Sequence, residues 1–140
     1  MFQDGMKMSG KLKITLNDKV VQEVDNLVVT SGKEFVASRM IGTSASVMSH
    51  MAIGSGSTAA AAGDTALGSE LGRTTATSSA SGAVVTYAST FAAGTGTGAV
   101  TEAGLFNASS SGDMLCRTVF SVVNKGASDS MTISWTVTVS

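Results

Sequence analysis

The segment Ser130–Ser140 alternates apolar and hydroxyl side chains without an exception. Its apolar positions are Met131, Ile133, Trp135, Val137 and Val139. Because successive side chains on a strand point to opposite faces, this pattern predicts a β-strand with one buried face and one open, uncharged face. At about 3.3 Å per residue the strand would run roughly 36 Å, which is long for a small domain. A strand of this kind favours a β-sandwich.

The rest of the chain also has sequence patterns typical of β-strands. Apolar or alternating runs, separated by turn residues, predict about eight strands with the spacing typical of a sandwich, jelly roll or small barrel. We therefore expect an all-β, antiparallel, jelly-roll-like β-sandwich over residues 11–140, preceded by a flexible amino-terminal arm over residues 1–10. The expected strands cover residues 11–16, 20–24, 47–53, 73–78, 83–91, 99–106, 113–121 and 130–140.

One or two short helices are expected between these strands. Ser31 and Glu34 have the spacing of a capping box and predict a helix over Gly32–Met40. Its apolar face would be Phe35, Val36 and Met40. Residues 54–63 read GSGSTAAAAG, a low-complexity loop, and Asp64 is expected to cap a second helical turn through Leu71.

Composition excludes several classes of function. Only 14% of the residues are charged, the net charge is −1, and Ser, Thr, Ala and Gly make up about half of the chain. No basic stripe is present, so we expect no direct binding of nucleic acid. No run of about 20 apolar residues is present, so we expect no membrane span. The single cysteine, Cys116, excludes an internal disulfide, is expected to pack as a small hydrophobe, and fits synthesis in a reducing cytoplasm.

No arrangement of residues typical of catalysis is found. His50 is the only histidine, and one His with one Cys does not make a metal cluster. The glycine-rich run 94–98 joins two expected strands and lacks the following helix that a dinucleotide site needs. We therefore expect no catalytic, cofactor-binding or metal-binding residues, no cofactor, and a protein that is not an enzyme.

Glu102 is the one carboxylate inside a mostly apolar strand. A buried glutamate there would have a perturbed pKa and could be functional. The alternatives are that Glu102 faces outward while its neighbours Thr101 and Ala103 face inward, or that it pairs with Arg117 of the next strand. We favour the structural pair.

Three stretches of the sequence carry a resemblance to a known family: Asn26–Met40, Ser49–Ser57 with Gly63–Leu71, and Gly98–Asn107 with Thr118–Lys125. They resemble small structural proteins of tailed bacteriophages, most of all the jelly-roll capsid cement (decoration) proteins such as that of Bordetella phage. This resemblance implies a virion protein on the capsid exterior that clamps neighbouring major capsid proteins and strengthens the shell against packaged DNA. It implies no catalytic residues.

Two segments are expected to contact partners, because they have little folded structure of their own. Both the arm and the 54–63 loop are candidates for contact with the major capsid protein. A homo-oligomer is also expected, with a dimer favoured over a trimer because two-fold pairing is the commonest symmetric contact. The candidate interface residues are Phe2, Met6, Met8, Ser55, Ser57 and Thr58.

Two other functions stay open at this stage. The chain could be a tail adaptor or a fibre-attachment component, for which trimeric assembly would be the sign. It could instead be a carbohydrate-binding jelly roll, which would need exposed aromatic side chains for stacking on sugar.

Overall fold

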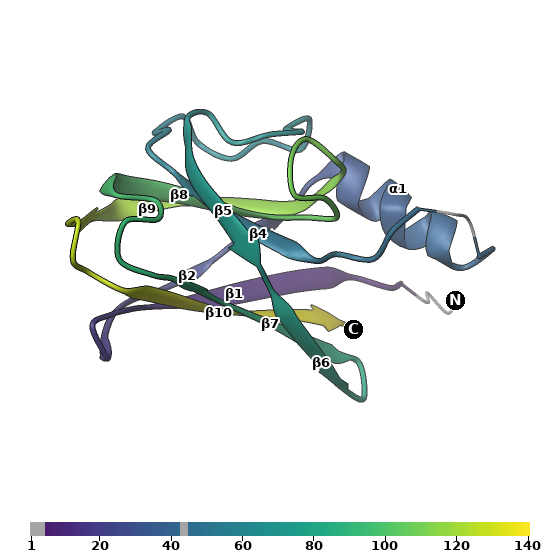
Figure 1. The fold of residues 1–140 in the computed structure, drawn as a ribbon. Coiled ribbons are helices and arrows are strands. Elements are labelled where there is room, and N and C mark those ends of the chain that lie inside the picture. Colours follow the sequence, from purple (N-terminus) through teal and green to yellow (C-terminus); the bar gives the residue numbers. More distant parts are fainter. Residues whose placement is uncertain (1–4, 43–44) are drawn as a thin grey trace.

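The computed structural model describes residues 5–42 and 45–140 and shows two antiparallel sheets packed face to face (Figure 1). Each sheet has five strands. The first sheet has the order β2 (Lys19–Asp25), β1 (Met8–Leu16), β10 (Met131–Val139), β7 (Val84–Phe91) and β6 (Thr77–Ser81). The second has the order β3 (Leu27–Val28), β9 (Met114–Lys125), β8 (Gly98–Phe106), β4 (His50–Gly54) and β5 (Glu70–Thr75).

This architecture confirms the predicted all-β antiparallel sandwich. The consecutive pairs β1–β2, β4–β5, β6–β7 and β8–β9 are hairpins within one sheet, and the chain passes between the sheets after β2, β5, β7 and β9. Ten strands are described where about eight were expected. One cause is the predicted strand 73–78, which breaks at Ala76: its N–H bonds to the Ser49 carbonyl, and the chain leaves one sheet for the other as β5 and β6.

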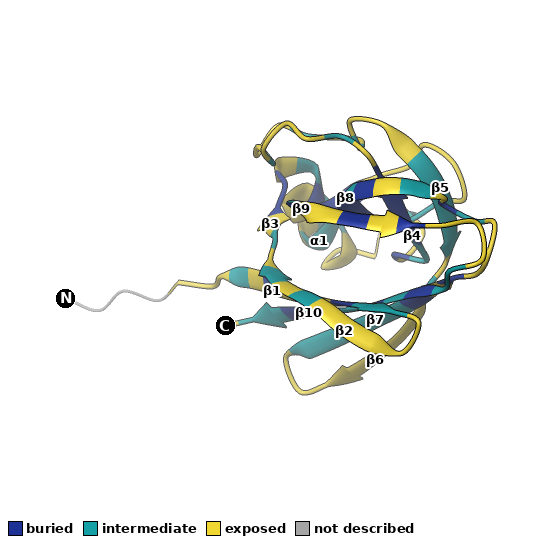
Figure 2. Ribbon diagram, turned by 90° about the vertical axis from the view of Figure 1, so that its left-hand side faces the viewer, coloured by how far each residue is buried: buried dark blue, intermediate teal, exposed yellow. Residues whose placement is uncertain are grey.

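The alternating carboxy-terminal strand lies at the centre of the first sheet, between β1 and β7. Met131, Ile133 and Trp135 are completely buried, and Val137 is nearly so. The intervening Ser and Thr side chains are half-buried on the outer face. The predicted strand and its buried face are therefore confirmed, and they supply one wall of the core between the sheets (Figure 2).

The predicted boundary of the amino-terminal arm at residue 10 is wrong. Strand β1 already begins at Met8, which lies opposite Val139 of β10. The Lys7 N–H also donates to the Ser140 carbonyl at 2.7 Å. Backbone pairing with the last strand thus draws residues 7–10 into the sheet, which a reading of side-chain periodicity alone does not reveal. Residues 1–4, with Phe2, lie outside the described residues.

The one helix of the described residues, α1 (Thr30–Arg39), begins two residues before its predicted start. The predicted capping box is wrong, because Val29 is the N-cap residue and no side chain caps the helix. The Ser31 hydroxyl instead donates to the Met114 carbonyl of β9 at 3.0 Å, which binds the helix to the second sheet. Phe35 and Val36 pack against the core as expected.

Three further expectations were also wrong. Met40 does not belong to the packed face of α1, since it is 79% exposed just beyond the end of the helix. The strand predicted from residue 47 begins only at His50. The helical turn predicted from Asp64 to Leu71 does not form, because the Asp64 carboxylate binds the Ala61 N–H and Arg117 and the segment enters β5 at Glu70.

We predict that Gly32→Ala lowers the free energy of unfolding by about 3 kcal/mol, the upper end for overpacking, because the obstacle is backbone. An added Cβ at Gly32 would sit 2.8 Å from the Leu115 carbonyl carbon, so α1 could not keep its distance from β9. Urea titration of the purified chain measures the change. Gly63→Ala is the matched control, since its Cβ would meet nothing within 4 Å, and equal losses in both variants would contradict the explanation.

Candidate partner-binding surfaces

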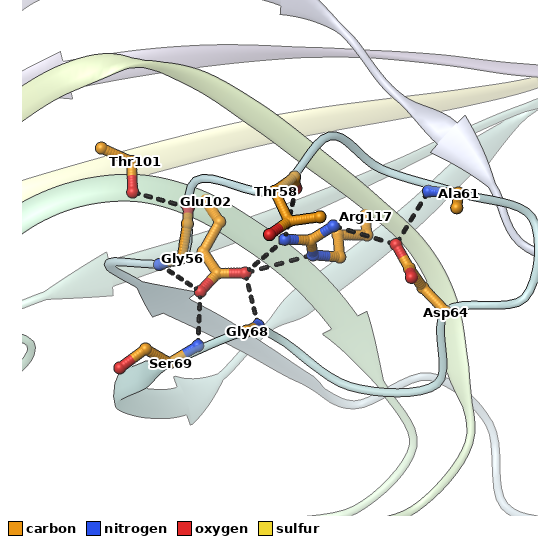
Figure 3. Close-up of polar contacts among 9 residues, drawn as sticks. All are labelled: Gly56, Thr58, Ala61, Asp64, Gly68, Ser69, Thr101, Glu102 and Arg117. Atoms are coloured by element: carbon orange, nitrogen blue, oxygen red, sulfur yellow. Dashed lines mark hydrogen bonds and ion pairs between the residues drawn. The ribbon is translucent and has the colours of Figure 1, made fainter.

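A buried carboxylate on the outer face of the second sheet organises the loop between β4 and β5 (residues 55–69, the β4–β5 loop). Glu102 of β8 is completely buried beneath this loop. Its carboxylate accepts backbone N–H bonds from Gly56 at 2.6 Å and from Gly68 and Ser69 at 2.8 Å (Figure 3). One side chain on a rigid strand therefore holds both ends of the loop.

Arg117 on the neighbouring strand β9 completes the cluster. Its Nε and Nη2 atoms donate to Glu102 Oε1 at 3.1 and 2.9 Å. Its Nη1 atom donates to Asp64 Oδ2 at 2.9 Å, and Nη2 also donates to the Thr58 carbonyl at 3.0 Å. The predicted pairing of Glu102 with Arg117 is confirmed, and the guanidinium holds the middle of the loop as Glu102 holds its ends.

The environment keeps Glu102 ionised. Burial by itself raises the pKa of a carboxyl group, but here the three backbone N–H donors and Arg117 outweigh burial and hold the pKa of Glu102 below its ordinary value. The other expected orientation holds only in part. Glu102 faces outward under the loop and Ala103 packs in the core between the sheets, but the Thr101 hydroxyl bonds to the Gly56 carbonyl of the loop and does not face the core. The group is engaged in structure, with both oxygens occupied by protein donors.

Two glycines of the low-complexity segment are required by this cluster. An added Cβ at Gly56 would lie 2.8 Å from the Glu102 carboxyl carbon, and one at Gly54 would lie 2.6 Å from Oε2. The backbone approaches the carboxylate so closely that only a residue without a side chain fits. The run that looks unspecific in sequence therefore has a specific spatial role.

The loop residues predicted to contact a partner lie on the surface. Ser55, Ser57 and Thr58 are exposed. The loop is nevertheless held in place, because the Ser55 N–H donates to the Ser69 carbonyl and the Thr101 hydroxyl donates to the Gly56 carbonyl. A partner that binds this loop would not have to order it first, which removes one of the free-energy costs of association.

A second hydrogen-bonded arginine anchors the neighbouring turn. The Arg73 guanidinium of β5 stacks 3.9 Å from the centre of the Phe106 ring and donates to the Ala108 and Ser111 carbonyls. It also forms two hydrogen bonds with the Glu70 carboxylate, whose side chain is 37% exposed. Arg73 therefore fixes the turn between β8 and β9 beside the β4–β5 loop.

The other predicted interface segment borders an apolar groove. Met6 is 75% exposed, and Met40, at the end of α1, is 79% exposed, with Ile41 beside it at 82%. Between the segment before β1 and α1 lies a hollow of about 470 Å³, which we call the Met6 groove. Met8, by contrast, is half-buried and packs partly against the core. The groove is lined by Met6, Lys7, Met8, Lys33, Val36, Ala37 and Met40.

The outer face of the first sheet divides into a charged part and a neutral part. Lys11 and Lys13 of β1 lie opposite Asp25 and Glu23 of β2 and border a hollow of about 540 Å³. Across β10, β7 and β6 the face carries Ser, Thr and small apolar residues, and the Thr90 and Thr132 hydroxyls lie 3.1 Å apart on adjacent strands. This neutral part is a broad surface that costs less to dehydrate than a charged surface of the same area.

Thiol chemistry, metal binding, a membrane span and sugar stacking would need, in turn, a reactive cysteine, a metal cluster, a long apolar helix and exposed aromatic rings. Cys116 is completely buried and burial raises the pKa of its thiol far above the ordinary range, so the expected packing role is confirmed. Across residues 5–42 and 45–140, no three His, Cys, Asp or Glu side chains gather to hold a metal ion, and no helix is long and apolar enough to span a membrane. Every aromatic side chain in that part of the chain is buried or half-buried.

Comparison with known proteins adds no relative: no family, curated protein or solved structure matches this chain.

We predict that Glu102→Gln lowers the free energy of unfolding by about 3–5 kcal/mol, since it leaves Arg117 as a buried cation without its main partner. Glu70→Gln makes the same chemical change at a partly exposed ion pair and should cost about 1 kcal/mol or less. Urea denaturation of both variants measures the difference. Similar losses would show that the Glu102 pair does not hold the loop.

The lowered pKa of Glu102 also predicts a dependence on pH. The unfolded chain takes up the proton first as the pH falls, because its glutamate has the higher pKa. The stabilisation is thus complete above the ordinary value of 4.5 and is lost as the pH falls through the folded-state pKa. Unfolding free energies measured between about pH 6 and pH 2 should fall more steeply for the wild type than for Glu102→Gln, and parallel curves would contradict this assignment.

Proposed function

We propose that this protein is a capsid cement (decoration) protein of a tailed bacteriophage, which binds the outside of the shell and clamps neighbouring major capsid proteins. The proposal takes its protein family from the resemblance of three sequence stretches to phage capsid cement proteins. The Met6 groove is the observation on the molecule that carries it. A homo-oligomer, with a dimer favoured, is part of the same proposal.

The Met6 groove has the properties of a protein-binding surface. Met6 and Met40 line the groove and are each at least three-quarters exposed, as is Ile41, which follows Met40 in the chain. Exposed apolar side chains that gather in this way mark protein-binding surfaces. Methionine side chains are flexible and polarisable, so they adapt to the shape of an apolar partner. Lys7 and Lys33 border the groove and would suit carboxylates beside the apolar contact.

Two further surfaces support a clamp that contacts more than one neighbour. The β4–β5 loop presents Ser57 and Thr58 from a backbone fixed by Glu102 and Arg117. The neutral part of the first sheet offers a separate docking face. Contacts of modest strength on several surfaces give strong attachment once they act together, because the later contacts form within one complex.

Cryo-electron microscopy of particles from cells expressing this gene with its genomic neighbours tests the proposal. We expect density for the chain at regular positions over the outer surface of an icosahedral shell. Density at a single vertex or on the tail would replace the proposal with the adaptor or fibre-attachment function. Absence from every particle would reject a virion role.

We predict that the double variant Met6→Ser/Met40→Ser binds shells at least about tenfold more weakly, since each change removes exposed apolar surface from the groove. Binding is measured by co-sedimentation with shells that lack the protein. Val20→Ser/Val122→Ser removes apolar side chains of 50% and 53% exposure elsewhere and should bind as the wild type does. Unchanged binding of the methionine variant would contradict a role for the groove.

A further inference from the structure

We propose that β6 is the site where two copies of this chain join, edge to edge, in one continuous antiparallel sheet. This extends the homodimer of the proposed function, but the observations that carry it concern β6 alone. Strand β6 forms the free edge of the first sheet, and all five of its residues are exposed. Figures 1 and 2 show the β6–β7 hairpin at the margin of the sandwich, with β6 outermost.

The backbone of β6 has unpaired groups to offer. Along an antiparallel pair, hydrogen-bonded positions alternate, so half of the backbone N–H and C=O groups of an edge strand point away from its neighbour. The pairing of β6 with β7 runs in unbroken register from Thr77 opposite Ala88 to Ser81 opposite Val84. The outer edge is therefore a template for another strand that no bulge interrupts.

The other edge strands have features that discourage such pairing, and β6 has none of them. Strand β2 carries Lys19, Glu23 and Asp25, and a bulge interrupts its pairing with β1. Strand β5 carries Glu70 and Arg73, and its pairing with β4 also has an irregularity. Strand β3 has only two residues. Charges, bulges and shortness are the usual means by which proteins protect an edge.

The composition of β6 favours a second copy of this chain as the added strand. No charged residue occurs from Thr74 to Thr101, so identical hairpins can meet without like-charge repulsion. A two-fold axis through Ser79 would place Ser78 opposite Ala80 of the second copy and Thr77 opposite its Ser81. All of these side chains are small, and facing hydroxyls form favourable cross-strand pairs. The same patch on both copies is the form that a two-fold interface takes.

The axis through Ser79 gives a specific test with full-length protein and analytical ultracentrifugation. The wild type is expected to sediment as a dimer of the 14.0 kDa chain at about 0.1 mM. Ser79→Lys and Ser79→Glu each place like charges opposite one another and should raise the dissociation constant at least about tenfold. An equimolar mixture of the two variants places opposite charges together and should recover the dimer.

The control is Ser109→Lys, which adds the same charge at an exposed position in the turn after β8 and should leave the dimer intact. Circular dichroism spectra confirm that each variant is folded. A wild type that stays monomeric, or a dimer that Ser79→Lys does not weaken, would overturn the proposal. A monomeric wild type would also remove the homodimer from the proposed function, but either result leaves shell binding standing, because that is tested on particles through the Met6 groove.

Discussion

The ion pair between Glu102 and Arg117 is the interaction on which the surface of the second sheet depends. A buried carboxylate is strongly unfavourable unless donors satisfy it, and here backbone N–H groups of Gly56, Gly68 and Ser69 do so together with the guanidinium. The ion pair and the β4–β5 loop depend on each other. The charges need the loop to exclude water and complete their hydrogen bonds, and the loop, which has few apolar side chains, needs the charges to hold one conformation.

This arrangement explains how a chain dominated by small residues presents defined surfaces. Its apolar core lies between the two sheets, and a smaller apolar cluster around Phe106, Met114 and Leu67 lies on the outer side of the second sheet. Loops of Ser, Ala and Gly bury too little apolar area to hold a single conformation. Hydrogen bonds and ion pairs from charged side chains on the strands hold it instead. Arg73 does the same for the adjacent turn. Rigid scaffold strands thereby position exposed loops, as is common at binding surfaces.

The proposed contacts of this protein lie on different parts of the sandwich. The Met6 groove and the β4–β5 loop belong to surfaces that would face a shell, whereas β6 is a sheet edge suited to a second copy. Different physics governs each: apolar burial in the groove, preorganised polar groups on the loop, and backbone hydrogen bonding at the edge. A clamp built from a dimer would double the number of shell contacts without any new surface.

Local sequence determined the strands with strong alternation, and tertiary structure decided the rest. The period of two in Ser130–Ser140 determines a strand and its buried face, because the apolar side chains of an alternating strand turn to the core and the polar ones to the outer face. The sequence also predicted the Glu102–Arg117 pair, because opposite charges inside neighbouring apolar strands have few other partners. The sequence could not reveal that Asp64 joins them, that Ser31 binds β9 rather than capping α1, or that residues 7–10 pair with β10. Those outcomes depend on partners far away in the chain, and only the packed fold brings them within hydrogen-bonding distance.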